Sequence, residues 1–153
     1  GIHQAAGKSL EQDCRKLNGC AVGEAKITPG HNLPAKWVIH TVSPIWQNGQ
    51  YQEEQLLRNC YRNCLNLVHS QEIESIAFPA LGTGTGKFNL ETAARIAVTE
   101  IQDFLMTYFQ LQQIILVCRD LPTYQTYRQV VTEIIEPLSL QPLLNKSDIT
   151  VLS

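Results

Sequence analysis

Several features that mark common classes of protein are missing from this sequence. It has no block of lysines and arginines and a formal net charge of −2, so its composition carries no nucleic-acid footprint. No apolar run approaches the ~18 residues of a membrane-spanning helix. The first residues lack the basic and apolar regions of a secretory signal, and there is no initiator Met. We therefore expect a processed or excised intracellular protein, cytoplasmic or nuclear, without nucleic-acid or membrane partners.

Disulfide and metal-ligand patterns are also lacking. The five cysteines are odd in number and form no C-x-x-C pair, which argues against a disulfide framework or a zinc site. Cys60 and Cys64 share one helix face, as small packing residues in a reducing compartment do. The four histidines show no metal-ligand spacing, and spacing alone assembles no Ser/His/Asp or Cys/His constellation. We expect no metal and no cofactor.

What the sequence contains is an alternation of apolar strands with amphipathic helices. Strands are predicted at 23–29, 37–42, 76–79 and 114–117, and helices at 2–17, 56–68, 90–109 and 124–135. This alternation favours one three-layer α/β domain with a largely parallel central sheet, over residues 1–136. The pattern decays after Glu136, so residues 137–153 form a tail without a firm structural assignment.

The most informative segment is Phe78–Phe88, in which three glycines alternate with two threonines between a predicted buried strand and a predicted helix. A strand, a glycine loop and a helix together present backbone N–H groups and a helix N-terminus to a phosphate. Glycine suits such a loop because it reaches positive φ and lets a ligand approach the backbone. If the chain has a ligand, we expect its phosphates here.

Two well-known phosphate loops are excluded at this position. A Walker A loop needs Gly, four residues and then Gly-Lys-Ser/Thr, but Leu81 takes the first glycine position and Phe88 follows Gly-Lys. A dinucleotide fingerprint needs a third glycine where Lys87 stands. The loop is therefore either another kind of phosphate loop or a structural turn. Asp120, at the end of a predicted strand, also has two interpretations, as a ligand residue or as the cap of the next helix.

Several segments, taken in chain order, resemble the macro domain, the α/β module that binds ADP-ribose. They are Gly1–Gly7, Gly23–Gly30, Leu33–Pro44, Ile76–Gly84 and Leu90–Ala94. The match covers about residues 1–135, and a series of motifs in order is far more specific than any one of them. The resemblance implies a three-layer α/β/α sandwich with a mixed central sheet.

The resemblance also implies a set of ligand-binding residues. The diphosphate would be held by the backbone amides of the glycine loop, namely Gly82, Thr83, Gly84, Thr85 and Gly86. Phe88 would pack near the adjoining ribose, and Ile2 would line the pocket. Arg119 stands where the family often has an aromatic residue that stacks on adenine, and a guanidinium can stack on a base as well. Asp120 lies beside it at the same strand end.

The sequence departs from the family in two regions. Gly86, Lys87 and Asn89 replace an aromatic residue, a glycine and a proline that are frequent there. The family's first strands, first phosphate loop and catalytic segment are not recognised before Gly1, so no catalytic residue is assigned. Ser147-Asp148-Ile149-Thr150 resembles the family's opening Gly-Asp-Ile-Thr, which would make Asp148 an adenine ligand in a circularly permuted domain. The alternative is a linker that leads out of the domain.

Three functions follow from these observations. The first is binding of ADP-ribose or of ADP-ribosylated protein through the glycine loop. The second is hydrolysis, with removal of ADP-ribose from proteins or derivatives. The third is a structural or protein-interaction domain that binds no nucleotide.

Overall fold

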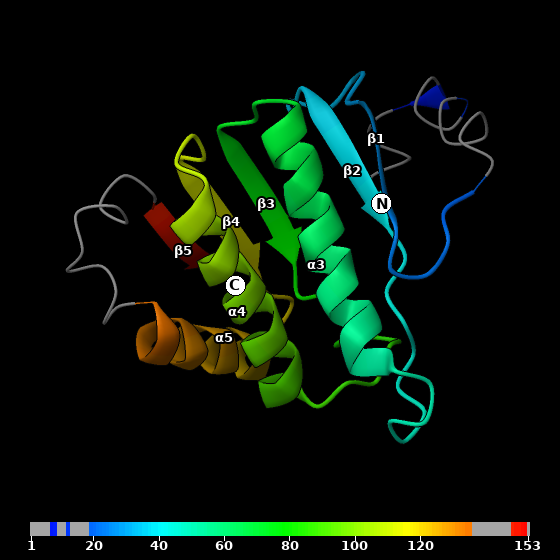
Figure 1. Ribbon diagram of the computed structural model, residues 1–153, viewed down its shortest axis with the longest axis vertical. Helices are drawn as coiled ribbons and strands as arrows, with labels where there is room; N and C mark the ends of the chain where they lie inside the picture. The colour runs from blue at the N-terminus through cyan, green and yellow to red at the C-terminus, as the bar shows by residue number, and fades with distance from the viewer. Residues whose placement is uncertain (1–6, 9–11, 13–18, 136–147, 153) are drawn as a thin grey trace.

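The computed structural model describes residues 7–8, 12, 19–135 and 148–152 (Figure 1). The elements, in chain order, are β1 (Ala25–Pro29), β2 (Trp37–Thr41), α3 (Glu53–Ser70), β3 (Ser75–Pro79), α4 (Leu90–Thr107), β4 (Gln113–Val117), α5 (Leu121–Ile134) and β5 (Asp148–Leu152). Every strand and helix predicted between residues 23 and 135 is present. The helix predicted at 2–17 lies mostly outside the described residues.

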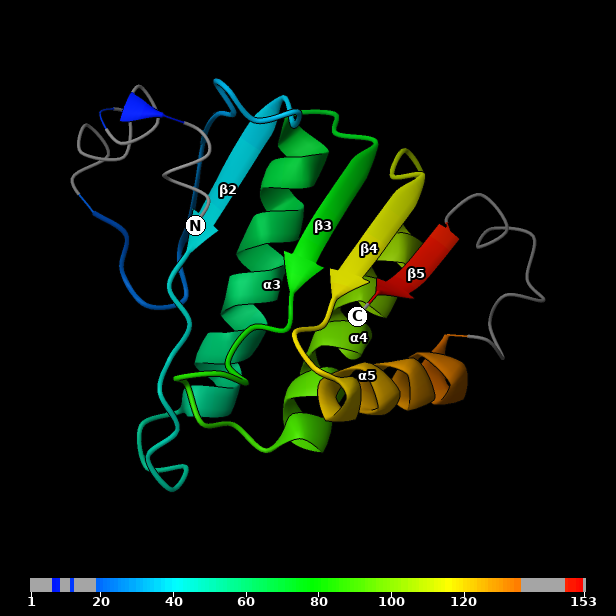
Figure 2. The same ribbon diagram turned by 180° about the vertical axis from the view of Figure 1, so that it is seen from behind.

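The strands form two sheets. β1 and β2 are antiparallel, with Ala25 opposite Thr41. β3, β4 and β5 form a parallel sheet in that order. Both ribbon views show β2 and β3 side by side and pointing the same way (Figures 1 and 2), yet they are not paired. The expected α/β sandwich with mixed strand directions is confirmed, but its described strands do not make one continuous sheet.

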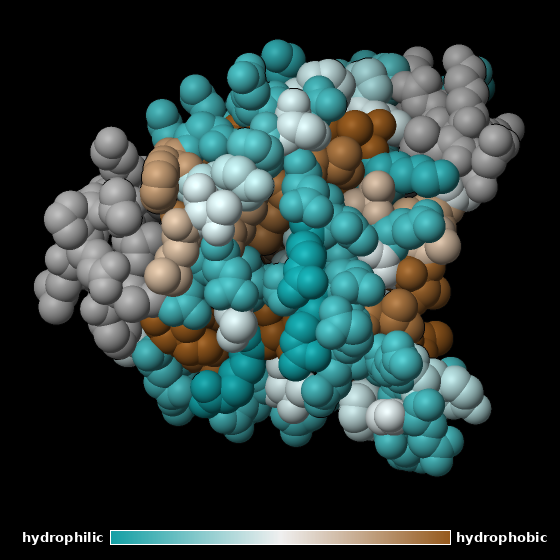
Figure 3. Space-filling model, viewed as in Figure 1, coloured by the Kyte–Doolittle hydropathy of each residue, from teal (hydrophilic) through white to brown (hydrophobic). Residues whose placement is uncertain are grey.

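Helices α3 and α4 cover one face of the strands, as the view from behind shows (Figure 2). Leu57, Tyr61 and Leu65 recur at helical spacing on α3 and are fully or almost fully buried, so this stripe faces the core. The outward face of both helices is mostly hydrophilic (Figure 3). There the Arg62 guanidinium of α3 donates to the Glu100 carboxylate of α4, with Nη2 2.9 Å from Oε1.

The end of the chain contributes a strand to the parallel sheet. β5 lies along β4, with Gln113 opposite Asp148 and Val117 opposite Leu152. Residues 148–152 therefore do not form a linker that leaves the domain, while the preceding tail residues 137–147 lie outside the described ones. No helix in the described ranges is both long and apolar enough to cross a membrane.

The register of β5 corrects the expected place of Asp148. Asp148 pairs with the first residue of β4, whereas the glycine loop follows Pro79, which pairs with the last residue of β4. At ~3.3 Å per residue, these two ends of the sheet are about 13 Å apart. Asp148 therefore begins β5 at the end of the sheet opposite to the glycine loop and does not lie beside that loop, and its role toward a ligand stays a prediction.

Candidate functional site

The glycine loop joins the end of β3 to the start of α4 and closes on itself. The Phe88 N–H donates to the Gly82 carbonyl at 2.9 Å, and the Lys87 N–H donates to the Gly84 carbonyl at 3.2 Å. Gly82 has a φ of +83°, a conformation that L side chains rarely adopt. A Cβ on Gly86 would come within 2.7 Å of the Gly82 carbonyl oxygen. Glycine is therefore required at both ends of this turn.

Two aromatic residues from other elements hold the loop in place. The Tyr61 hydroxyl of α3 accepts the Leu81 N–H at 3.2 Å. The backbone N–H of Trp46 donates to the Gly86 carbonyl at 2.7 Å, and the Trp46 ring packs against Phe88 with centroids 5.4 Å apart. The sequence interpretation missed both residues, because Tyr61 looks like any core position of an amphipathic helix. Trp46 could have been singled out, because it is a large aromatic residue just before the polar segment 47–52.

Several backbone N–H groups of the loop have no hydrogen-bond partner among the described residues. Within the described part of the chain, the N–H groups of Gly82, Gly84, Thr85 and Gly86 make no hydrogen bond. Thr83 differs, because its N–H and its hydroxyl both point to the Ala80 carbonyl, at 3.4 and 2.7 Å. Gly82 and Gly86 are buried residues, where an unpaired N–H group is costly. A cluster of unpaired N–H groups in a glycine turn is suited to an anion.

A cation lies beside these donors. Arg119 follows β4 and is exposed, and its Nη1 lies 3.1 Å from the position that a Cβ on Gly84 would occupy. The structure thus brings Arg119 and the glycine loop together, while stacking of Arg119 on adenine stays a prediction. The two segments meet because parallel strands place their carboxyl ends at one edge of the sheet.

Asp120 caps the following helix. Its carboxylate accepts the Thr123 N–H at 3.0 Å at the start of α5. Hydrogen bonds from the Thr123 side chain and backbone lower the pKa of Asp120, and the neighbouring Arg119 charge lowers it further. Of the two interpretations of Asp120, the structure shows the helix cap. A role of Asp120 in ligand binding stays a prediction.

The N-terminus of α4 contributes less than the sequence suggested. The Asn89 side chain accepts the Thr92 N–H at 3.1 Å, so this first-turn donor is already used. Glu91 adds a negative charge to the same turn. Phe88 is only 5% exposed and packs below Gly82, so its ring supports the loop from inside. The groups that an anion could use here are therefore the loop amides and Arg119 rather than the first turn of α4.

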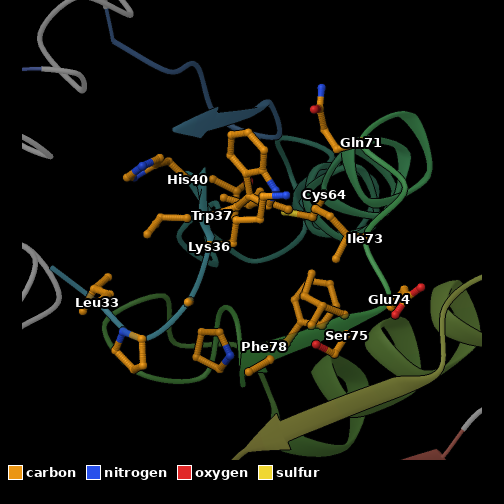
Figure 4. Close-up of a pocket in the computed structure, with 18 of the residues that line it drawn as sticks. Leu33, Lys36, Trp37, His40, Cys64, Gln71, Ile73, Glu74, Ser75 and Phe78 are labelled. Carbon is orange, nitrogen blue, oxygen red and sulfur yellow. The ribbon is translucent and has the colours of Figure 1, made fainter. Parts of the chain in front are cut away.

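A separate groove of about 830 Å³ lies between β2 and β3 (Figure 4). Pro79 and Leu81 line its end near the glycine loop, but no residue of 82–86 does. The glycine loop and the groove are therefore separate regions. No group of three or more His, Cys, Asp or Glu side chains in the described ranges could hold a metal ion. Ile2, the predicted pocket residue, lies outside those ranges.

Comparisons with known proteins agree on one family. The model of the macro domain matches residues 1–97. A macro domain-containing protein of Methanosarcina mazei is 44% identical over 134 residues, which are 88% of this chain and 72% of the relative. The O-acetyl-ADP-ribose deacetylase of Salmonella newport is 42% identical over 136 residues, which are 86% of this chain and 76% of the relative.

Solved structures show the same likeness in three dimensions. The Oceanobacillus iheyensis macrodomain with ADP superposes with a TM-score of 0.81 at 36% identity, covering 89% of this chain and 75% of the other. The Trypanosoma brucei macrodomain in complex with ADP-ribose gives 0.78 at 36% identity, covering 85% and 54%.

The match of the family model begins at residue 1, and the relatives align over most of the chain. These matches do not support the expected loss of the amino-terminal half-site, nor a permutation. The family resemblance itself is confirmed, and the chain belongs to the macro domain family.

Proposed function

We propose that this chain binds ADP-ribose, free or attached to protein, with the diphosphate on the loop of residues 82–86. The observation that carries the proposal is the set of four loop N–H groups without a partner in the described part of the chain. A diphosphate offers several anionic oxygens, which are strong acceptors for backbone N–H groups. The solved relatives contain ADP in one case and ADP-ribose in another, which supports this choice of ligand.

Arg119 has a double role in the proposal. Its guanidinium, beside Gly84, offsets the charge of the diphosphate, and its flat face is available for stacking on adenine. Phe88 acts indirectly, because its buried ring fixes Gly82 from below. Ile2 and Asp120 complete the proposed ligand set as predictions from the family resemblance. Specificity would come from the adenine and ribose contacts, and affinity from the diphosphate.

The proposal is tested by thermal melting of the intact protein with ADP-ribose, ADP and adenosine. A ligand at 100 times its Kd stabilises the folded state by ~2.7 kcal/mol, which is readily seen as a rise in Tm. We expect ADP-ribose and ADP to raise the Tm and adenosine, which has no phosphate, to leave it unchanged. If ADP-ribose gives no shift at millimolar concentration, the chain is a non-binding structural or interaction domain.

A matched pair of variants at Thr85 locates the binding site. Thr85→Pro removes the backbone N–H of an exposed loop residue, whereas Thr85→Ala keeps it. We expect the proline variant to bind ADP-ribose at least ~5-fold more weakly, the loss of about one charge-assisted hydrogen bond, and the alanine variant to bind normally. Equal binding by both variants, with the unliganded Tm unchanged, would place the diphosphate elsewhere.

Hydrolysis is the second candidate, and the O-acetyl-ADP-ribose deacetylase from Salmonella newport is the observation in its favour. A diphosphate fixed on the loop would hold the distal ribose still while a water attacks its substituent. No described residue is assigned as the base. Conversion of O-acetyl-ADP-ribose to ADP-ribose and acetate, followed by chromatography, decides the point: binding without turnover leaves the binding module as the function.

A further inference from the structure

One buried carboxylate holds the loop that leads into α3, residues 47–52, which we call the pre-α3 loop. The Glu53 carboxylate accepts backbone N–H groups from three of its residues, Gln47, Gly49 and Tyr51. The Glu53 side chain is almost fully buried, and a buried charge is tolerated where such hydrogen bonds replace its hydration. Three donors on one carboxylate therefore fix the path of the pre-α3 loop from inside.

The backbone of the pre-α3 loop is strained. Asn48 and Gln52 have φ values of +60° and +57°, in the left-handed region that side chains other than glycine rarely adopt, and Gly49 between them has +75°. A hydrogen bond across the turn, from the Gln50 N–H to the Gln47 carbonyl, is long at 3.3 Å. Conformations of this kind persist where the surroundings fix them. The hydrogen bonds to the buried carboxylate supply that restraint.

Trp46 connects the pre-α3 loop to the glycine loop. Both ribbon views place the start of α3 at the end of the molecule where the glycine loop follows β3 (Figures 1 and 2). The Trp46 ring contacts both loops: it packs on Phe88, and a Cβ on Gly49 would come within 3.3 Å of it. Its backbone N–H holds the Gly86 carbonyl. A shift of the pre-α3 loop therefore moves Trp46 and releases the glycine loop at Gly86.

We propose that Glu53 is a positioning residue of the glycine loop, acting through Trp46 and not on the ligand itself. Its carboxylate holds the pre-α3 loop in the conformation in which Trp46 fixes Gly86, whose own N–H is one of the four without a partner in the described part of the chain. Loss of this restraint lets the loop N–H groups diverge, so a diphosphate can no longer use them together. The inference rests on the proposed function, because the diphosphate is the ligand of that loop.

The test compares Glu53→Gln with the intact protein in two measurements. Hydrogen exchange at residues 82–88 is followed without nucleotide, and the Kd for ADP-ribose is measured by calorimetry. Glu54→Gln makes the same change of charge on the next residue. Leu111→Val removes one buried methylene before β4, at the far end of the sheet, and controls for a general loss of stability. Gly49→Ala is a second route to the same effect, because it leaves the carboxylate in place and crowds the Trp46 ring.

We expect Glu53→Gln and Gly49→Ala to speed exchange at residues 82–88 by at least ~5-fold, with residues 113–117 of β4 unchanged. Both should raise the Kd for ADP-ribose at least ~5-fold, while Glu54→Gln and Leu111→Val keep it. If Glu53→Gln does not fold, Gly49→Ala decides by the same two measurements.

Unchanged exchange at residues 82–88 in the Glu53 and Gly49 variants would overturn the proposal. Faster exchange with an unchanged Kd would overturn it too, and so would a Kd raised equally by Leu111→Val. An intact protein that binds no ADP-ribose would refute the proposed function instead. Exchange, which needs no nucleotide, would then still decide whether Glu53 holds the glycine loop.

Discussion

The guanidinium of Arg119 lies beside the backbone of Gly84, with Nη1 3.1 Å from the point that a Cβ on Gly84 would occupy. One residue follows β4 and the other follows β3, and these neighbouring parallel strands end together, with Pro79 opposite Val117. The contact places a positive charge next to loop N–H donors that have no partner among the described residues. A single anionic group can therefore use both at once.

Replacing Arg119 should weaken ligand binding without affecting the fold. Because its side chain is exposed, we expect Arg119→Gln to keep the Tm of the unliganded protein and to raise the Kd for ADP-ribose by about 5- to 20-fold, or ~1–2 kcal/mol. Calorimetric titration measures the change. Arg128→Gln, an exposed arginine two turns into α5, is the charge-matched control and should bind normally.

A further variant separates charge from stacking. Arg119→Lys keeps the positive charge but loses the planar guanidinium. Recovery of the affinity in this variant indicates a phosphate contact, whereas a loss equal to that of Arg119→Gln indicates stacking on adenine. An unchanged Kd in all Arg119 variants would contradict any contact with the ligand.

Two glycine-to-alanine substitutions in the loop should lower the free energy of unfolding by clearly different amounts. The new Cβ in Gly86→Ala meets the Gly82 backbone at 2.7 Å, so the turn must open. In Gly84→Ala the Cβ meets only the far end of Arg119, which can swing away. We expect Gly86→Ala to lower the free energy of unfolding by about 1–3 kcal/mol and Gly84→Ala by less than ~0.5 kcal/mol. Urea unfolding measures both, and equal losses would mean that the loop is not closed as described.

Glu53 should make the stability of the protein depend on acid pH. It is 2% exposed, and its carboxylate accepts the N–H groups of Gln47, Gly49 and Tyr51, at 3.2 and 2.7 Å for the first two. Burial acts to raise the pKa of Glu53, but these hydrogen bonds outweigh it and lower the pKa below its ordinary value of 4.5. A group with a lowered folded-state pKa stabilises the protein above its unfolded-state pKa. That contribution is lost as the pH falls through the folded-state value.

We therefore expect Glu53→Gln to destabilise the protein at pH 7 and to lose this disadvantage progressively below about pH 4.5. Unfolding of both proteins at a series of pH values gives the comparison. Glu54→Gln is the matched control, since within the described ranges its half-exposed carboxylate pairs only with Arg58, at 3.7 Å. A difference between wild type and Glu53→Gln that stays constant down to pH 3 would show that the carboxylate is not needed in its charged form.

The elements could be predicted from the sequence because their patterns are local. The stripe of Leu57, Tyr61 and Leu65 marks α3 by its helical period, and Asn89 and Asp120 stand where helix caps belong. Pairing between strands is not local in this sense. An apolar run shows that a strand is buried, but it does not show which strand lies next to it, so the break between β2 and β3 was not foreseen.

The site could be predicted in part for the same reason. Gly82, Gly84 and Gly86 predict a tight turn. Because parallel strands place their carboxyl ends at one edge of the sheet, Arg119 is expected near this turn. Tyr61 holds that turn through a hydroxyl that no periodicity distinguishes from a packing group. Asp148 was placed by a four-residue resemblance, and its position depends instead on the register of β5 along β4.

The two tryptophans of the chain stand at different places. Trp37 lines the groove between the sheets, while the Trp46 backbone N–H donates to the Gly86 carbonyl and its ring packs on Phe88 beneath the glycine loop. Each indole is therefore a built-in optical probe of one region. With Trp37→Phe, tryptophan fluorescence reports on the loop alone, and with Trp46→Phe on the groove alone, so a change at one region can be followed in real time without a signal from the other.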